Sequence, residues 1–187
     1  MACKNSLSPG TLIFAISFKL LAIEYLFGKR LADLLDQVVK LPADLWGFHQ
    51  EDLADFDAFC VKAGNKLAEM FAQVKLDPRK QKLFSLIYSS KGDTSVKALA
   101  DNSCWSSRQI NRYFNGHFGT SLKSYCNILR FRASFTQIKE GKFFHEGNFA
   151  DQSHFIKKIK RFSGVVPKEL TKNKNDRFIQ FSLLPHK

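Results

Sequence analysis

The stretch DQSHFIKKIKRFSGVVPKEL, residues 151–170, carries the most specific pattern in this chain. Asp151 belongs to the residue types that cap the N-termini of helices. Phe155, Ile159 and Phe162 follow at i, i+4 and i+7 and therefore share one face of a helix, while lysines and an arginine occupy the other faces. The pattern predicts a short basic helix with an apolar inner face.

The end of this stretch predicts a turn and then a second helix. Gly164 can take the left-handed conformation that commonly ends a helix. Pro167 suits the first turn of the next helix, because the N–H that proline lacks has no helical partner there. A short helix with an apolar inner face and a cationic outer face has the size and charge to enter the major groove of DNA.

The positive charge of the chain is concentrated in its second part. The 187 residues carry a formal net charge of +12. Residues 1–75 contain 8 Lys/Arg and 9 Asp/Glu, whereas residues 76–187 contain 21 Lys/Arg and 8 Asp/Glu. This asymmetry indicates a polyanion-binding module attached to a neutral segment, and a solvated basic surface is the alternative.

The composition does not point to a metal site, a membrane span or an enzyme. The cysteines are scattered without CxxC or Cys/His spacing, which is typical of a reduced, cytoplasmic chain: Cys3, Cys60, Cys104 and Cys126. The apolar run 11–27 contains charged residues and is short for a membrane helix. The sequence also lacks an acid pair, a Ser/His/Asp set and a phosphate-binding loop. We therefore expect no metal, no cofactor, no membrane contact and no catalysis.

The first part of the chain, residues 1–76, predicts a small and mostly helical segment. Residues 12–18 are β-branched and aromatic and predict at most a short strand. Residues 20–27 and 31–39 predict short helices, and residues 51–74 predict a longer amphipathic helix.

The helix expected at residues 51–74 has two interpretations. Its apolar residues alternate in steps of three and four: Leu53, Phe56, Cys60, Ala63, Leu67, Met70 and Val74. We favour packing against its own chain, because Gly64 and Asn65 weaken the repeat. The alternative is a coiled-coil seam that forms a weak homodimer.

Residues 95–119 predict a first helix-turn-helix. Ser95 can cap a short helix, residues 101–103 form a polar turn, and Ser106 begins a second helix. Ser106 and Gln109 match the S-x-x-Q capping box.

The second of these helices has an outer face without acidic residues. Ile110 and Phe114 lie on its buried face. Arg108, Asn111 and Arg112 face outward, and Arg and Asn are the side chains that bridge the edges of guanine and adenine. This composition favours a DNA recognition helix, with a plain surface helix as the alternative.

Residues 121–139 predict one long helix that links the first motif to a second at residues 143–164. Such a helix spans about 28 Å. Consecutive faces of the major groove lie about 34 Å apart, so this length suits two recognition helices one turn of DNA apart. Before the first motif, residues 81–89 predict a further helix.

The order of these elements, with the motifs DQSHF and FSGVVPKEL, resembles the DNA-binding domain of the AraC family of bacterial transcription regulators. The resemblance covers residues 81–171 and implies two helix-turn-helix subdomains joined by a linker helix. The base-contacting residues that it implies are Arg108, Asn111 and Arg112 in the first recognition helix and Gln152, Ser153, His154 and Lys157 in the second. The implied phosphate contacts come from Arg161 and from the helix N-termini, which in the first helix are Ser106 and Ser107.

Two departures from the family pattern bear on function. Only residues 142–150 separate Gly141 from the start of the second recognition helix, and this segment is short for a positioning helix and its turn. We therefore expect packing of Phe143, Phe144 and Phe149 to support the recognition helix instead. Residues 1–76 are too few and too helical for the β-barrel effector domain usual in this family. We therefore expect no small-molecule effector pocket.

The sequence as a whole predicts a mainly α chain with three parts: residues 1–76, a DNA-binding domain at 77–172 and a tail at 173–187. We expect a cytoplasmic regulator of transcription that binds double-stranded DNA sequence-specifically, with RNA polymerase as a further candidate partner. The alternative is a protein-interaction or dimerisation module whose second motif binds DNA weakly. For His154, packing at the surface is the alternative to a groove contact.

Overall fold

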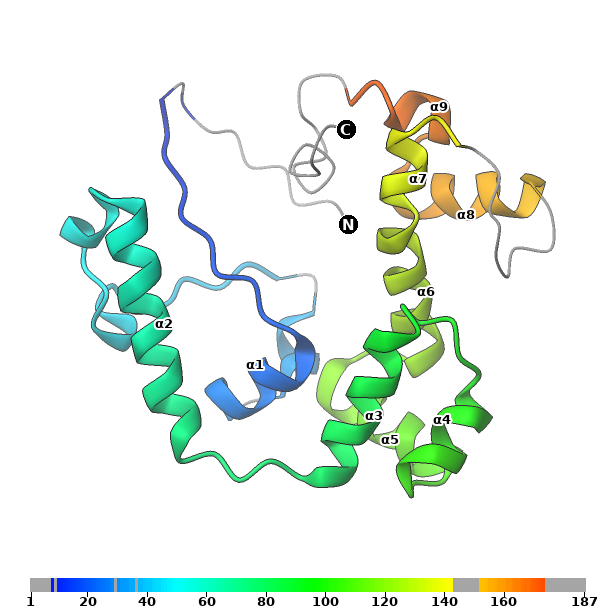
Figure 1. The fold of residues 1–187 in the computed structure, drawn as a ribbon, viewed down its shortest axis with the longest axis horizontal. Coiled ribbons are helices and arrows are strands. Elements are labelled where there is room, and N and C mark those ends of the chain that lie inside the picture. The colour runs from blue at the N-terminus through cyan, green and yellow to red at the C-terminus, as the bar shows by residue number, and fades with distance from the viewer. Residues whose placement is uncertain (1–7, 9, 29, 36, 143–151, 174–187) are drawn as a thin grey trace. The chain divides into compact units, whose positions relative to one another are not determined.

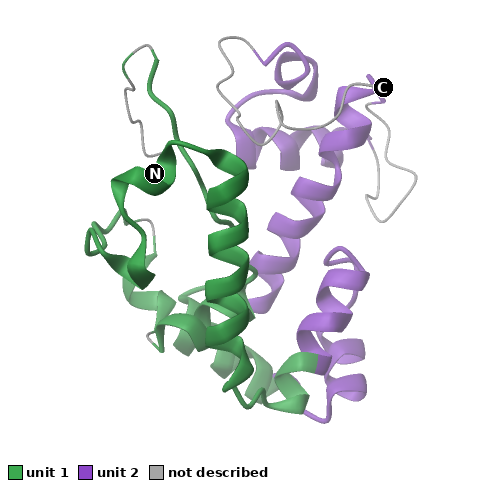
Figure 2. Ribbon diagram, turned by 60° about the vertical axis from the view of Figure 1, so that its left-hand side comes forward, with its two compact units in different colours: residues 1–81, 108–120 green, residues 82–107, 121–187 purple. Residues whose placement is uncertain are grey.

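The chain is mainly helical, as predicted. The computed structural model describes residues 8, 10–28, 30–35, 37–142 and 152–173 (Figure 1). No residue in these ranges belongs to a β-strand. Two compact units divide the chain, and they are coloured separately in Figure 2: unit 1 comprises residues 1–81 and 108–120, and unit 2 comprises residues 82–107 and 121–187.

Unit 1 contains several short elements, one longer helix and most of another. The elements that lie wholly in it are α1 (Leu20–Phe27), η1 (Leu31–Leu34), η2 (Leu45–Gly47), η3 (Gln50–Leu53) and α2 (Phe56–Ala72). All but the first residue of α5 (Ser107–Phe118) also belongs to unit 1. The prediction for α1 is confirmed, and Gly28 ends this helix with φ +58°.

The expected strand at residues 12–18 is wrong. These residues adopt no regular element, and the ring of Phe14 packs against Phe56 and Phe59, with centroids 5.1 Å away in both cases. A strand requires a neighbouring strand to satisfy its backbone groups. The described residues contain none, and the rings of Phe14 and Phe18 pack on other aromatic rings instead, whereas Leu12 and Ile13 are exposed.

The expected helix at residues 31–39 is reduced to the single 3-10 turn η1. Leu35 leaves the helical region with ψ +129°. Val38 and Val39 are β-branched and lower helix propensity. Pro42 follows shortly afterwards and disfavours a helical residue before it.

The helix expected at residues 51–74 begins later and buries only part of the predicted face, with Ala63 buried and Cys60 exposed. Asp55 caps α2, because its carboxylate accepts hydrogen bonds from the N–H groups of the second and third helical residues. Phe59 and Ala63 are the buried residues of this helix, whereas Phe56 is 58% exposed. The ring of Phe59 meets the rings of Phe14 and Phe48. Aromatic residues elsewhere in unit 1 therefore select the face of α2 that is buried.

Unit 2 contains the remaining helices. They are the larger part of α3 (Pro78–Ser89), α4 (Val96–Ser103), α6 (Leu122–Ala133), α7 (Phe135–Lys139), α8 (Gln152–Ser163) and α9 (Pro167–Leu170).

The cap predicted at Ser95 is confirmed, since its hydroxyl accepts a hydrogen bond from the Ala98 N–H at 3.1 Å. The turn after α4 comes later than predicted. Helix α4 continues through Ser103, and Cys104 makes the turn with φ +58°.

Buried contacts explain why α4 is longer than its polar sequence suggests. Ser103, expected in the turn, is 2% exposed and shares the buried face of α4 with Leu99 and Ala100. The side-chain amide of Asn102 donates to the Ala98 carbonyl at 2.8 Å, so this polar residue is hydrogen-bonded within the helix.

The linker helix expected at residues 121–139 is divided at Ser134 into α6 and α7. Ser134 is fully buried, and its hydroxyl donates to the Phe131 carbonyl at 2.6 Å. Its N–H is shared between the carbonyls of Arg130 and Phe131. A serine that bonds to the backbone inside a helix competes with the regular ladder, which accounts for the interruption.

Helices α6 to α9 share one hydrophobic cluster of the core of unit 2. The buried members of this cluster are Phe135, Ile138, Phe155, Ile159, Val165 and Leu170. Phe162, predicted on the same face of α8, is 36% exposed and lies at its edge, where its ring stacks on Phe131 at 5.2 Å. Gly164 has φ +78° and Pro167 opens α9, both as predicted.

Several predictions lie outside the described residues. They concern the packing of Phe143, Phe144 and Phe149, the cap at Asp151, and most of the tail at 173–187.

Candidate nucleic-acid interface

Helix α5 presents a polar outer face over a buried inner face. Ile110 and Phe114 are buried, as predicted, and Phe118 is buried with them. Arg108 and Arg112 are exposed, and their spacing of four residues places them on the same side of the helix. Asn111 is half-buried. The helix contains no Asp or Glu, so no carboxylate on α5 neutralises the positive charge of its outer face.

The start of α5 lies next to the two serines predicted to meet phosphate. Ser106 is exposed and precedes the helix, and Ser107 is its first residue and half-buried. The first N–H groups of a helix point outward from its N-terminus and favour anions. The serines therefore flank a group of donors suited to phosphate oxygens.

Helix α8 repeats this arrangement in unit 2. Phe155 and Ile159 are buried on its inner face, and this helix also contains no Asp or Glu. The residues predicted to contact DNA are all exposed: Gln152, Ser153, His154, Lys157 and Arg161.

The spacing on α8 gathers part of this set into a row. Ser153, Lys157 and Arg161 follow one another at intervals of four and lie along one side of the helix. Lys158 is half-buried instead, and its ammonium donates to the Asn127 side-chain oxygen at 3.3 Å. Burial and the positive charge of Arg130 lower the pKa of Lys158.

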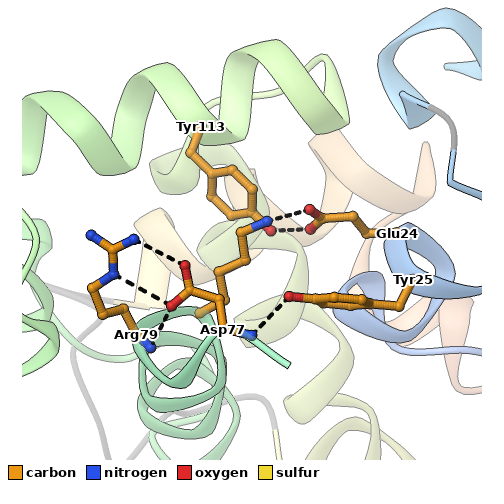
Figure 3. Close-up of polar contacts among 6 residues, drawn as sticks. Glu24, Tyr25, Asp77, Arg79 and Tyr113 are labelled. Atoms are coloured by element: carbon orange, nitrogen blue, oxygen red, sulfur yellow. Dashed lines mark hydrogen bonds and ion pairs between the residues drawn. The ribbon is translucent and has the colours of Figure 1, made fainter. Parts of the chain in front are cut away.

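The inner side of α5 carries a polar cluster that the sequence did not predict. Figure 3 shows the Tyr113 hydroxyl directed at the carboxylate of Glu24 on α1. The Lys80 ammonium lies 2.5 Å from the other oxygen of the same carboxylate. Tyr113 is 9% exposed, and the side chains of Glu24 and Lys80 are 12% and 18% exposed.

Electrostatics keep the Tyr113 phenol protonated. Burial, together with the hydrogen bond to the Glu24 carboxylate, raises the pKa of this phenol far above its ordinary value. The raised pKa favours the protonated hydroxyl, which donates to Glu24. The Lys80 ammonium also lies 4.9 Å from the centre of the Tyr113 ring, within the range of a cation–π interaction.

Part of this cluster could be anticipated from the sequence. Tyr113 follows Ile110 by three residues on the buried face of α5, and a buried hydroxyl needs a hydrogen-bond partner. No local rule identifies Glu24 as that partner, because 89 residues separate the two along the chain.

A shallow, open hollow lies on α2 and the residues before it, with Trp46, Val61, Lys62 and Asn65 among its lining residues. The described residues hold no group of three or more His, Cys, Asp or Glu side chains that could bind a metal ion. Within the same part of the chain, no helix combines the length and apolar character needed to cross a membrane. No protein-family model, curated protein or solved structure matches this chain.

Proposed function

We propose that this chain binds double-stranded DNA sequence-specifically and regulates transcription. The observation that carries the proposal is the pair of helices α5 and α8, each with a buried apolar face and a polar, cationic outer face free of acidic residues. A surface helix that only meets water usually mixes both signs of charge. A helix that approaches phosphates and base edges benefits from positive charge alone.

The proposed contacts follow from side-chain chemistry. Arg108 and Arg112 on α5 can bridge guanine, and Asn111 beside them can bridge adenine. On α8 the proposed base contacts are Gln152, Ser153, His154 and Lys157. The proposed phosphate contacts are Ser106, Ser107 and Arg161. The proposal includes no catalytic step, and RNA polymerase is a candidate partner of the DNA-bound chain.

A second candidate function is protein interaction or dimerisation through η3 and α2. The observation in its favour is the apolar surface there: Leu53, Phe56 and Val61 are 42%, 58% and 64% exposed. Sedimentation at micromolar concentration separates the two candidates. A stable dimer that binds all DNA sequences equally weakly would support this second function.

In vitro selection of DNA from a random pool, at two salt concentrations, tests the first proposal. We expect an enriched sequence whose affinity falls steeply with salt, because each phosphate contact releases counterions. Two enriched boxes about one helical turn apart would assign base contacts to both α5 and α8, and a single box would assign them to one helix.

Arg112→Ala tests the outer face of α5 directly. We expect a loss of about 1–3 kcal/mol in binding the selected site and a relaxed preference at one base position. Arg132→Ala is the matched control, because Arg132 is an exposed arginine on α6 to which no base contact is assigned. The assignment is wrong if Arg112→Ala keeps the base preference of the parent.

A further inference from the structure

We propose that Glu24 positions the recognition helix α5, so that residues 1–81 form part of the DNA-binding module. The inference rests on the proposed function of α5. Its basis is that one carboxylate on α1 joins two other parts of unit 1. One oxygen of Glu24 accepts from Tyr113 on α5 (Figure 3), and the other pairs at 2.5 Å with Lys80, in the first turn of α3.

The lysine that pairs with Glu24 is itself fixed by aromatic rings. Its ammonium lies 4.9 Å from the ring centre of Tyr113 and 5.6 Å from that of Tyr25. The Tyr25 hydroxyl in turn accepts a hydrogen bond from the Asp77 N–H at 2.9 Å. Helix α1 therefore contacts both α5 and the residues that lead into α3, through side chains that are mostly removed from solvent.

A second set of contacts holds the C-terminal end of α5. The Arg30 guanidinium donates through Nε to the Gly116 carbonyl at 2.8 Å. Gly119, with φ +64°, lies so close to Ala32 that a Cβ on it would be 3.1 Å from the Ala32 Cα. Residues near α1 therefore support α5 both in its middle and at its end, and both supports are independent of the outer arginines.

The exact placement of a helix matters more for contacts to bases than for attraction to phosphates. Bidentate bonds to base edges need the side chains held to a fraction of an ångström, whereas attraction between cations and phosphates tolerates changes of orientation. Loss of the Glu24 contacts should therefore reduce the affinity for a selected site and leave the affinity for random DNA near that of the parent. A merely destabilised chain would lose both together.

The test compares Glu24→Ala, Glu24→Gln and Tyr113→Phe with the control Glu69→Ala. Glu69 is also a glutamate of unit 1 in an ion pair, with Lys66 at 3.0 Å, but its side chain is 70% exposed. Glu24→Gln keeps the side-chain volume and an oxygen that accepts from Tyr113, so it separates the loss of the charge from the loss of the contact. Tyr113→Phe removes only the hydroxyl that donates to Glu24 and keeps the ring beside Lys80, so this variant decides the question if Glu24→Ala unfolds.

Hydrogen exchange of the free protein gives the first measurement. In Glu24→Ala we expect the amides of α5 to exchange at least about tenfold faster, with α8 unchanged, and Glu24→Gln to restore part of the protection. The second measurement is the ratio of affinities for the selected site and for random DNA, which we expect to fall about tenfold. Glu69→Ala should match the parent in both.

The two hypotheses fail in different ways. Parent-like exchange of α5 in Glu24→Ala, or in Tyr113→Phe if Glu24→Ala unfolds, overturns the positioning role, whether or not the chain binds DNA. A parent that shows no sequence preference overturns the proposed function, and the exchange rates then still decide whether Glu24 holds α5.

Discussion

Substitution of Gly92 by alanine probes the close approach between the end of α3 and α6 in unit 2. Gly92 has φ +78°, and a Cβ built on it would lie 2.5 Å from the Cys126 carbonyl oxygen and 3.0 Å from the Cys126 Cα. Both are backbone atoms, so no side-chain rotation relieves the overlap. The left-handed conformation costs an L-residue about 1–2 kcal/mol, and displacement of a packed helix costs about 1–3 kcal/mol more. We expect Gly92→Ala to lower the free energy of unfolding by about 2–5 kcal/mol.

Gly141→Ala separates the two contributions. Gly141 lies in the same unit and has a similar φ of +72°, but a Cβ built on it would meet no atom of the described residues within 4 Å. This variant should lose only the conformational part, about 1–2 kcal/mol. Urea denaturation followed by circular dichroism gives both free energies. Equal losses in the two variants would refute the argument that the backbone of α6 blocks a side chain at position 92.

Two further predictions concern side chains that are buried or half-buried. Phe155 is fully buried in the core of unit 2, so Phe155→Ala should lower the free energy of unfolding by about 3–5 kcal/mol in thermal or urea denaturation. Phe162 lies at the exposed edge of the same cluster, and a loss in Phe155→Ala no larger than that in Phe162→Ala would contradict the assigned core. Burial raises the pKa of the phenols of Tyr113 and Tyr125 above the ordinary 10.0. The native state then keeps protons that the unfolded state releases, so the free energy of unfolding should fall as the pH rises above 10, by about 1.4 kcal/mol per pH unit for each tyrosine. Denaturation curves of Tyr125→Phe should show a shallower decline, and a slope equal to that of the parent would refute this origin.

Local signals in the sequence predict the ends and inner faces of several helices. Ser95 caps α4 because its hydroxyl reaches an N–H three residues later, an interaction that depends only on adjacent sequence. Gly164 and Pro167 mark the turn between α8 and α9 for the same reason. The buried faces of α5 and α8 follow from helical periodicity, so the exposure of Arg112 could be predicted as well.

Features that depend on distant residues could not be predicted in this way. Residues 12–18 have the composition of a strand, but a strand needs a partner that the local pattern does not report. The interruption at Ser134 depends on burial of its hydroxyl. The cluster at Tyr113 needs Glu24, whose position relative to α5 is set by tertiary folding.

The interleaving of the two units has a consequence for how the chain folds. Unit 1 is complete only when residues 108–120 join residues 1–81, and residues 82–107 must form a closed loop for this to happen. Closing a flexible loop of that length costs about 3 kcal/mol of chain entropy. During synthesis, α1 and α2 therefore leave the ribosome well before the helix that completes their unit. We expect α5 to order late, and no uninterrupted fragment of the chain contains either unit without residues of the other.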